Sequence, residues 1–476
     1  MIILKNRKFF GVKHFTAVLL TILMLASVVV LPAGAETINN EASSTSEIKF
    51  TDISLSSTHT AAIATDGSLY TWGENASGTL GNGTTNDSYS PIKVMSNVKS
   101  VVAGTANTIV VTKNGDLYTW GQNYHGQLGN EKQTNFSYVP IKIMSDMNSV
   151  AAGDSPYYMA ISKTGELYAW GDLRYGQSTS SNLYDITTPS KIATSINEEI
   201  VKVSIGSGHN GLITKSGYLY TWGQNLYGEL GYGYKDTKYV STTPATVMKT
   251  VKDLSFGGYI SAAITDDGML YTWGSNGAGE LGDGNNKDKY SPNKIMDNVV
   301  SVSMGRSHGA AITEDGSLYT WGYNNYGQLG DGTTTERNTP TKIMDHVKYV
   351  CAGFWSTAAI TEDGSLYTWG YNKKGQLGDG TTTNRYTPTK ITVTSNNNDS
   401  SAPNTTGDID GDGKITSADS LYILRASVKL ENFTDTQNKL ADVDKDGKIT
   451  SSDALLVLRH SVGFRENDYI GKVLNE

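Results

Sequence analysis

A tryptophan–glycine pair recurs at nearly constant spacing along most of the chain, and this repeat constrains the fold more than any other feature. The repeated tryptophans are Trp72, Trp120, Trp170, Trp222, Trp273, Trp321 and Trp369. A unit of about 50 residues with four short β-rich runs cannot bury both faces of its own sheet, so neighbouring units must stack. Radial stacking of these units predicts an all-β, seven-bladed β-propeller over residues 47–395.

Each unit also carries a hairpin signal. In the segment from Ala310 to Trp321, Asp315-Gly316 separates two β-rich runs, and the whole segment recurs from Ala358 to Trp369. Asp-Gly is typical of tight hairpin turns because both central residues need positive φ. Paired alanines in the first run suit a crowded strand, which we expect nearest the propeller axis. The tryptophans are expected to fill the wider space between blades.

The units resemble the repeats of the regulator of chromosome condensation family. The resemblance rests on G-x-x-H-x-x-A-I-T-x-D-G-x-L-Y-T-W-G, which begins at Gly305, and on N-x-x-G-Q-L-G from Asn324 to Gly330. It extends over all the units, and members of this family form seven-bladed propellers. A propeller is a scaffold for many activities, so the resemblance implies the fold and leaves the function open.

Oxygen-bearing residues recur at fixed spacing in two loops of the C-terminal tail. Oxygen ligands at positions 1, 3, 5, 7, 9 and 12, with glycine at position 6, are typical of calcium loops. At position 7 of each loop, the ligand is the backbone carbonyl of a lysine. The expected ligands are Asp408, Asp410, Asp412, Lys414, Thr416 and Asp419 in the first loop, and Asp442, Asp444, Asp446, Lys448, Thr450 and Asp453 in the second. The sequence predicts two bound Ca²⁺ ions.

Two such loops, each followed by an expected helix (Leu421 to Val428 and Ala454 to Val462), resemble a type I dockerin over residues 407–463. The resemblance implies a small α-helical calcium-binding domain that binds the cohesin module of a scaffoldin, as in a cellulosome-like complex. The contact positions that it implies are Ser417, Ala418, Leu424, Arg425, Ser451, Ser452, Leu458 and Arg459. The near-duplicate halves would allow docking in either of two orientations. Leu-Arg replaces the Lys-Arg of many dockerins, which leaves the choice of cohesin open.

The first 35 residues differ from the rest of the chain. Basic residues precede an apolar run from Phe15 to Leu31, and Ala33-Gly34-Ala35 follows. This order is typical of a secretory signal peptide over residues 1–35, with an uncleaved membrane anchor as the alternative. Residues 396–406 are expected to be a flexible linker, and residues 464–476 a C-terminal tail. The sequence thus predicts a secreted, extracellular protein in a cell-surface assembly, held through a scaffoldin.

Charge and cysteine content argue against two classes of function. The formal net charge of −8 offers no basic surface for a phosphate backbone, so nucleic acid is not an expected partner. Cys351 lies in an apolar, β-rich run and is expected to be a small core residue, not a nucleophile. We expect no membrane contact after signal cleavage and a monomeric propeller.

Acidic residues of the units recur at turn positions, which argues for turn chemistry and against catalysis. Glycoside hydrolysis needs two carboxyl groups roughly 5 to 10 Å apart. His59, His209 and His308 share one repeat position, where hydrogen bonding to nearby backbone is expected and metal binding is the alternative. The expected function is a non-catalytic propeller that binds polysaccharide or protein. A glycoside hydrolase with an unrecognised site remains the alternative.

The loops that precede the paired small residues are expected to lie on one face of the propeller. In three units they carry aromatic residues, and these are Tyr157, Tyr158, Tyr259, Phe354 and Trp355. Because equivalent loops emerge on the same face, we expect these rings to be exposed around the axis and to bind a ligand. Packing of each ring over its own blade is the alternative.

Overall fold

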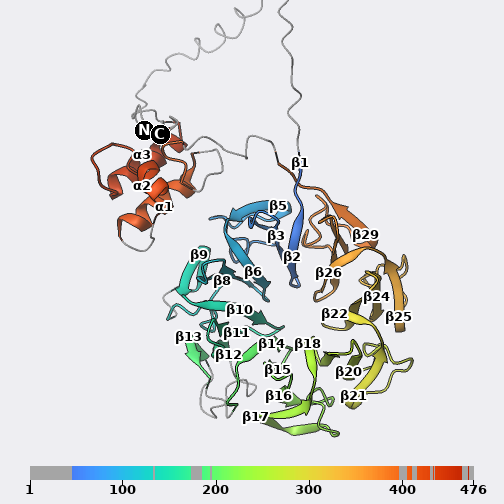
Figure 1. Ribbon diagram of the computed structural model, residues 1–476. Coiled ribbons are helices and arrows are strands. Elements are labelled where there is room, and N and C mark those ends of the chain that lie inside the picture. The colour runs from blue at the N-terminus through green and yellow to red at the C-terminus, as the bar shows by residue number, and fades with distance from the viewer. Residues whose placement is uncertain are drawn as a thin grey trace, which may run out of the picture. The chain divides into compact units, whose positions relative to one another are not determined.

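Seven four-stranded antiparallel sheets account for most of the described chain (Figure 1). The computed structural model describes residues 46–131, 134–172, 185–192, 196–395, 405–409, 415–428, 433, 435–463 and 470. Each sheet contains four strands that are consecutive in sequence and ordered from the axis outward, so each repeat unit forms one blade. The fold is the seven-bladed β-propeller that the repeat predicts.

The first strand of each blade lies nearest the axis and contacts the first strands of both neighbouring blades. These strands are β2 (Phe50–Leu55), β6 (Val98–Ala103), β10 (Met147–Ala152), β14 (Ile200–Ile205), β18 (Val251–Phe256), β22 (Val299–Met304) and β26 (Val347–Ala352). The expectation that paired alanines mark the axial strand is wrong, because Ala61 and Ala62 lie in the second strand. That strand is buried along its whole length between blades, which selects small side chains.

The second and third strands form the central hairpin of each blade. The second strands are β3 (His59–Ala64), β7 (Asn107–Thr112), β11 (Tyr157–Ser162), β15 (His209–Thr214), β19 (Ile260–Thr265), β23 (His308–Thr313) and β27 (Ser356–Thr361). The third strands are β4 (Leu69–Gly73), β8 (Leu117–Gln122), β12 (Leu167–Asp172), β16 (Leu219–Asn225), β20 (Leu270–Gly274), β24 (Leu318–Gly322) and β28 (Leu366–Gly370). Asp66 accepts a 2.8 Å bond from the backbone N–H of Ser68, and Gly67 has a φ of 89°. The hairpin turn therefore lies at the Asp-Gly pair as predicted, but the expectation of positive φ at both residues is wrong, because only the glycine has it.

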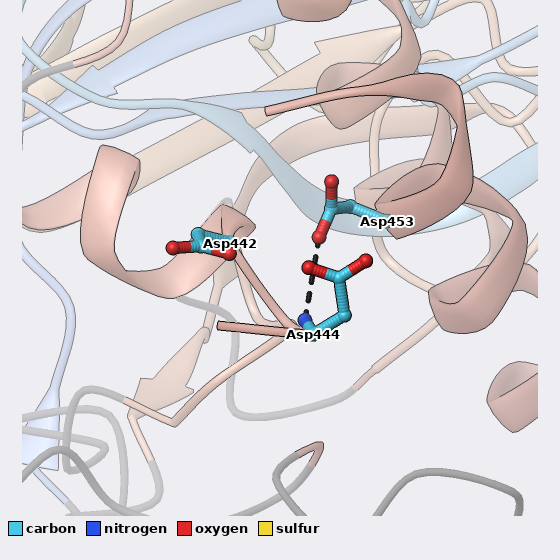
Figure 2. Close-up of side chains that lie close together, drawn as sticks. All are labelled: Asp442, Asp444 and Asp453. Atoms are coloured by element: carbon cyan, nitrogen blue, oxygen red, sulfur yellow. Dashed lines mark hydrogen bonds between the residues drawn. The ribbon is translucent and has the colours of Figure 1, made fainter. Parts of the chain in front are cut away.

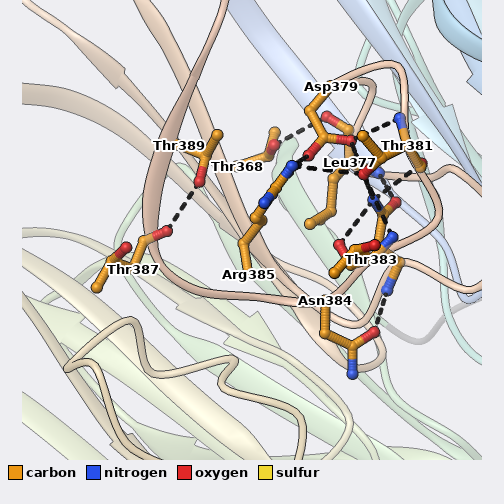
Figure 3. Close-up of polar contacts among 10 residues, drawn as sticks. Thr368, Leu377, Asp379, Thr381, Thr383, Asn384, Arg385, Thr387 and Thr389 are labelled. Carbon is orange, nitrogen blue, oxygen red and sulfur yellow. Dashed lines mark hydrogen bonds and ion pairs between the residues drawn. The ribbon is translucent and has the colours of Figure 1, made fainter.

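The fourth strand is the outer edge of each blade and follows a long loop. These strands are β5 (Ser88–Met95), β9 (Phe136–Met144), β13 (Asp185–Lys191), β17 (Asp236–Met248), β21 (Lys289–Met296), β25 (Arg337–Met344) and β29 (Arg385–Ile391). In blade seven, Arg385 donates a 2.6 Å bond to Asp379, which also accepts from Thr381 (Figure 3). Arg337 and Asp331 repeat this pair in blade six at 2.8 Å. These carboxylates hold their loops in shape.

The repeated tryptophans fill the space between blades, and all seven are fully buried. The indole N–H groups of six of them donate to backbone carbonyls of the preceding blade, as Trp120 does at Thr79 (2.9 Å) and Trp321 at Glu280 (2.8 Å). Gly81 lies so close to Trp120 that a Cβ at this position would be 2.5 Å from the indole nitrogen. Its φ of 74° also disfavours other residues.

Blades one and seven close the ring through three kinds of contact. The short strand β1 (Ser46–Glu47) pairs with β30 (Thr394–Ser395). The indole of Trp72 donates a 2.9 Å bond to the carbonyl of Gln376. Lys374 and Glu74 form an ion pair at 2.6 Å. The ring therefore closes without exchange of a strand between blades, since both blades consist of four consecutive strands.

Cys351 also lies at the contact between blades one and seven. It lies half-buried on β26, packed against the core that blades one and seven share. Its thiol is hydrogen-bonded to the backbone of Leu55, and burial raises the pKa of the thiol to about 12. Ser303 is the equivalent residue of blade six. Its hydroxyl accepts a 2.9 Å bond from the N–H of Ala352 in blade seven, so it bonds to the backbone of the next blade as the Cys351 thiol does. A thiol with a raised pKa is a poor nucleophile, in line with the packing role predicted from sequence.

The C-terminal region contains three helices, α1 (Ser417–Ser427), α2 (Asp435–Ala441) and α3 (Ser451–Ser461). Helices α1 and α3 contact each other around a small core that includes Ile423, Val443 and Val457. Both begin about one turn earlier than expected, and the sequence analysis did not predict α2. Within the described part of the chain, no helix is long and apolar enough to cross a membrane.

Several sequence predictions fall outside the described residues. They include the signal peptide over 1–35, the linker except for Thr405 and Thr406, and the tail except for Ile470. Asp410, Asp412 and Lys414 of the first calcium loop fall outside as well.

Candidate functional site

Three carboxylates of the second predicted calcium loop converge in the structure. Asp442, Asp444 and Asp453 each place an oxygen within 4.8 Å of the others (Figure 2). Gly447 makes the sharp turn at position 6, with a φ of 82°. A cluster of hard oxygen donors at this spacing fits Ca²⁺. Among the described residues, this is the only group of His, Cys, Asp or Glu side chains that converges in this way.

Asp453 combines two roles, since it is a predicted ligand and also the third residue of α3. One carboxylate oxygen accepts from the N–H of Val443 at 2.9 Å, and the other from the N–H of Thr450 at 2.9 Å. The Thr450 side chain accepts in turn from the N–H of Ser452, which completes a capping box. This box explains why the helix begins at Ser451 and not at Ala454.

The first loop repeats these contacts where it is described. The carboxylate of Asp419 is fully buried and accepts from the N–H of Ile409 at 2.7 Å and from that of Thr416 at 2.8 Å. Asp408 is also buried. The two halves therefore share one local architecture around position 12.

Asp446 is a predicted ligand of the second loop that lies apart from the converging carboxylates. Asp446 is exposed and accepts a 2.8 Å bond from the N–H of Lys448. Its carboxylate is not part of the converging group. Partial burial and then the charges of Asp453, Asp446 and Asp442 raise the pKa of Asp444. Crowded carboxylates of this kind are relieved when a cation binds between them.

An apolar surface follows the outer side of α1 and α3. It consists of Leu421 and Leu424 on α1 with Val428 directly after that helix, and of Leu455 and Leu458 on α3 with Val462 directly after that helix. All six are more than a third exposed. The two sets match residue for residue at a separation of 34 positions. We call them the α1 face and the α3 face. Duplicated apolar faces on a small domain are typical of binding surfaces.

The predicted cohesin contacts lie in the same two helices. Leu424 and Leu458 belong to the faces, while Arg425 and Arg459 are half-buried beside them. Ser417 and Ser451 begin the helices, followed by Ala418 and Ser452. Sequence reasoning missed Leu421, Val428, Leu455 and Val462, although repetition after 34 residues at helical spacing could have found them.

The predicted ligand face of the propeller needs a correction at Tyr157 and Tyr158. Both are completely buried at the start of β11. The hydroxyl of Tyr157 donates to Asn210 of blade four at 2.6 Å, and that of Tyr158 to Asn107 of blade two at 2.8 Å. These two rings fill the space between blades because they belong to the second strand, not to the loop before it.

Trp355, Phe354 and Tyr259 do lie in the loops. Trp355 is half-buried between Tyr326 and Tyr371, with ring centroids 5.4 and 5.5 Å away. Phe354 meets Trp355 edge to face at 4.5 Å. We call these four rings the Trp355 cluster. Tyr259 forms a separate pair with Tyr227 at 5.0 Å, so the expected single ring of aromatics around the axis is wrong.

The three histidines of the repeat are fully buried between blades. His59 Nε2 lies 2.9 Å from the hydroxyl of Thr108 in the next blade, and that hydroxyl donates to the carbonyl of Thr79. His209 with Ser261 and His308 with Thr357 repeat the contact at 2.9 Å. The histidines do serve as hydrogen-bonding groups, but the expected backbone partner is wrong at Nε2, which contacts a side chain of the neighbouring blade.

Comparison with protein families assigns both parts of the chain. The family model of the RCC1-like domain matches residues 31–296 and 97–406. That of the dockerin type I domain matches residues 406–460. Type I dockerin domains bind calcium, in agreement with the donor set described above.

Individual relatives agree with the propeller assignment. The ultraviolet-B receptor UVR8 of Arabidopsis thaliana is 30% identical over 250 residues, which are 52% of this chain and 46% of the receptor. The human ligase HERC5 is 35% identical over 100 residues, 20% of this chain and 10% of the ligase. The chain thus spans less than half the length of these relatives.

Two solved structures share the fold. Yeast RCC1 (Prp20), solved with Kap60, has a TM-score of 0.62 at 21% identity and covers 78% of this chain and 90% of its own. Human WBSCR16 has a TM-score of 0.61 at 20% identity, with 68% and 94% covered.

Proposed function

Because this chain belongs to the RCC1-like propeller family and ends in a type I dockerin domain, we propose that it is an extracellular interaction protein of a cellulosome-like complex. In this proposal, the dockerin at 407–463 binds a cohesin module of a scaffoldin and displays the propeller at 47–395 through the linker 396–406. The segment 1–35 directs export. The propeller serves as a non-catalytic binding module.

The duplicated α1 and α3 faces carry the proposal for docking. Each face presents three aliphatic side chains beside a half-buried arginine, Arg425 or Arg459. Apolar anchors next to arginine are typical of the centre of a protein interface. Since the faces are equivalent, either one can engage the same partner, which gives two docking orientations. One Ca²⁺ in each loop would hold the helices that carry the faces.

The Trp355 cluster supports a protein as the ligand of the propeller. Its rings meet at angles of 50°, 69°, 71° and 89°, so they form no flat platform for the face of a sugar. Angled, half-buried rings form a surface that accepts an apolar side chain. Polysaccharide is the other ligand class suggested by the sequence, and the test below separates the two.

We expect Trp355→Ala to reduce capture of the protein partner from culture medium by at least about tenfold, because interface tryptophans often contribute 2 kcal/mol or more. The control is Tyr138→Ala, which removes an exposed ring elsewhere on the propeller. Capture is measured on immobilised full-length chain alongside depletion of soluble polysaccharides. If Trp355→Ala lost polysaccharide binding and kept protein capture, the proposal of a protein ligand would be overturned. Release of reducing sugar by the wild-type chain would overturn the non-catalytic role.

A further inference from the structure

The seven innermost strands enclose a cavity of 320 Å³ along the propeller axis. Half-buried side chains from alternate positions of these strands line it, and the loops before the second strands form one of its mouths. Ligand pockets in proteins range from about 300 to 1,000 Å³, so this cavity matches a small molecule and not a polymer.

Charged groups at the strand end of the cavity already have partners. Lys202 contacts the carboxylate of Asp253, and Tyr349 is hydrogen-bonded to Asp52. These groups neutralise or satisfy one another within the wall. Among the described residues that line this end, Lys202 and Asp253 are the charged ones, and they neutralise each other.

The loop mouth differs, because Asp154 of blade three and Arg306 of blade six both line it. Blades three and six lie on opposite sides of the axis (Figure 1). Burial raises the pKa of Asp154, and the positive charge of Arg306 acts in the opposite direction. No ion pair within 4.0 Å joins the two among the described residues, whereas Arg337 and Arg385 are paired with aspartates. A carboxylate and a guanidinium therefore line one space without a direct ion pair between them, although the charge of Arg306 acts on Asp154.

Both groups are held in position. Asp154 accepts a 2.9 Å bond from the hydroxyl of Ser207, and its backbone carbonyl accepts one of 2.9 Å from Thr105. The guanidinium of Arg306 stacks 4.1 Å from the centroid of Phe354, which also lines the cavity. Stacking orients the planar donors of an arginine and leaves its edge free for a carboxylate.

We infer that the loop mouth binds a small zwitterion, with the ligand carboxylate on Arg306 and the ligand ammonium group on Asp154. Opposite charges in the wall favour a ligand that carries both a positive and a negative group. A ligand with a single charge would leave either Arg306 or Asp154 without a partner. The rim hydroxyl of Thr105 and the ring of Phe354 complete a site for an amino acid or a comparable amino carboxylate. This site is independent of cohesin docking and goes beyond the proposed function.

The test is a binding titration of the full-length chain with a graded series of amino carboxylates. The probes are glycine, 4-aminobutyrate and 6-aminohexanoate, compared with butyrate and butylamine as singly charged controls. We expect one member of the series to bind at least about tenfold more tightly than either control, since a hydrogen bond to a charged group contributes this much. Equal binding of a control, or no binding by any member, would overturn the inference.

Variants locate the site. Arg306→Gln and Asp154→Asn should each lower the affinity for the preferred zwitterion by about tenfold or more. Each variant should also bind that zwitterion no more tightly than one of the singly charged controls. Lys348→Gln and Asp266→Asn remove exposed charges that do not line the cavity, and these controls should bind as wild type. Unchanged binding in both mouth variants would place any bound zwitterion elsewhere and overturn the inference. The wild-type comparison still decides the matter if a mouth variant fails to fold.

Discussion

Removal of calcium from the full-length chain is expected to unfold residues 405–463 and to leave the propeller folded. The C-terminal module has only a small apolar core, and the lone cysteine of the chain lies in the propeller, so no disulfide can support the module. Without a cation, the converging carboxylates of Asp442, Asp444 and Asp453 repel one another. A bound ion at about 100 times its Kd would stabilise a loop by roughly 2.7 kcal/mol.

Hydrogen exchange with and without a calcium chelator measures this effect peptide by peptide. Amides of α1 and α3 should lose their protection in the chelator, while β-strand amides of the propeller in the same sample serve as the control. Asp453→Ala should expose α3 even when calcium is present, because it removes both a ligand and the capping box. Equal protection of the helices under both conditions would show that the module folds without metal.

Acidification from pH 6.5 to pH 4 is expected to destabilise the propeller by several kcal/mol. An unfolded histidine takes up a proton near pH 6.5, whereas burial lowers the pKa of His59 and His308 to about 4 and that of His209 to about 3. The unfolded state thus binds more protons in this range. The stabilisation is complete above pH 6.5 and is lost as the pH falls, by about 1.4 kcal/mol per pH unit for each histidine.

Geometry explains why these rings resist protonation. The hydroxyl that faces His308 Nε2 belongs to Thr357, which donates its own proton to the carbonyl of Gln328. The hydroxyl therefore accepts from Nε2–H, and a second proton would have to enter at Nδ1. This atom of His308 is buried without a hydrogen-bond partner. Asp52 acts in the opposite direction, since burial raises its pKa to about 6 and its protonation offsets part of the loss.

Denaturant unfolding followed by tryptophan fluorescence measures this prediction, because all eight tryptophans lie in the propeller. His308→Gln should flatten the slope of unfolding free energy against pH by about 1.4 kcal/mol per unit. His346→Gln replaces an exposed histidine outside the buried repeat positions and is the matched control. A stability that does not vary between pH 6.5 and pH 4 would contradict the neutral, buried state of these rings.

The repeat made the propeller predictable because a 50-residue β-rich unit has few ways to cover its faces. The calcium loop was predictable for a similar local reason. Its ligands lie within twelve residues, and the backbone turn at Gly447 brings them together. The paired aspartates of the outer loops, such as Asp379, were correctly attributed to turn chemistry.

The misplaced tyrosines show where sequence reasoning failed. Tyr157 and Tyr158 follow a loop-like Gly-Asp-Ser-Pro segment, but strand register places them between blades. The repeat contained a signal for this placement. The residue that begins the second strand of one blade contacts the second residue of the equivalent strand in the next blade. His59 meets Thr108, and Tyr157 meets Asn210. Such pairing between units becomes visible only when the neighbouring strands are aligned.

The loop mouth of the cavity and the α1 and α3 faces differ in how far they could be predicted from the sequence. Asp154 and Arg306 belong to blades that are distant in sequence, and only ring closure brings both residues to one cavity. The α1 and α3 faces are local, and the resemblance to a type I dockerin implied two of their members, Leu424 and Leu458, as cohesin contacts; both are exposed. Their role in cohesin binding stays a prediction.

Binding of the full-length chain to a type I cohesin module tests the central claim most directly. Calorimetry in calcium should show tight binding for wild type and for the exposed-lysine control Lys439→Asp. Leu424→Asp alone or Leu458→Asp alone should lower the affinity only about twofold, since one of two equivalent orientations remains. The double variant should lose more than about 30-fold, because both apolar anchors are gone. Loss of binding in one single variant, or full binding by the double variant, would contradict docking through two equivalent faces.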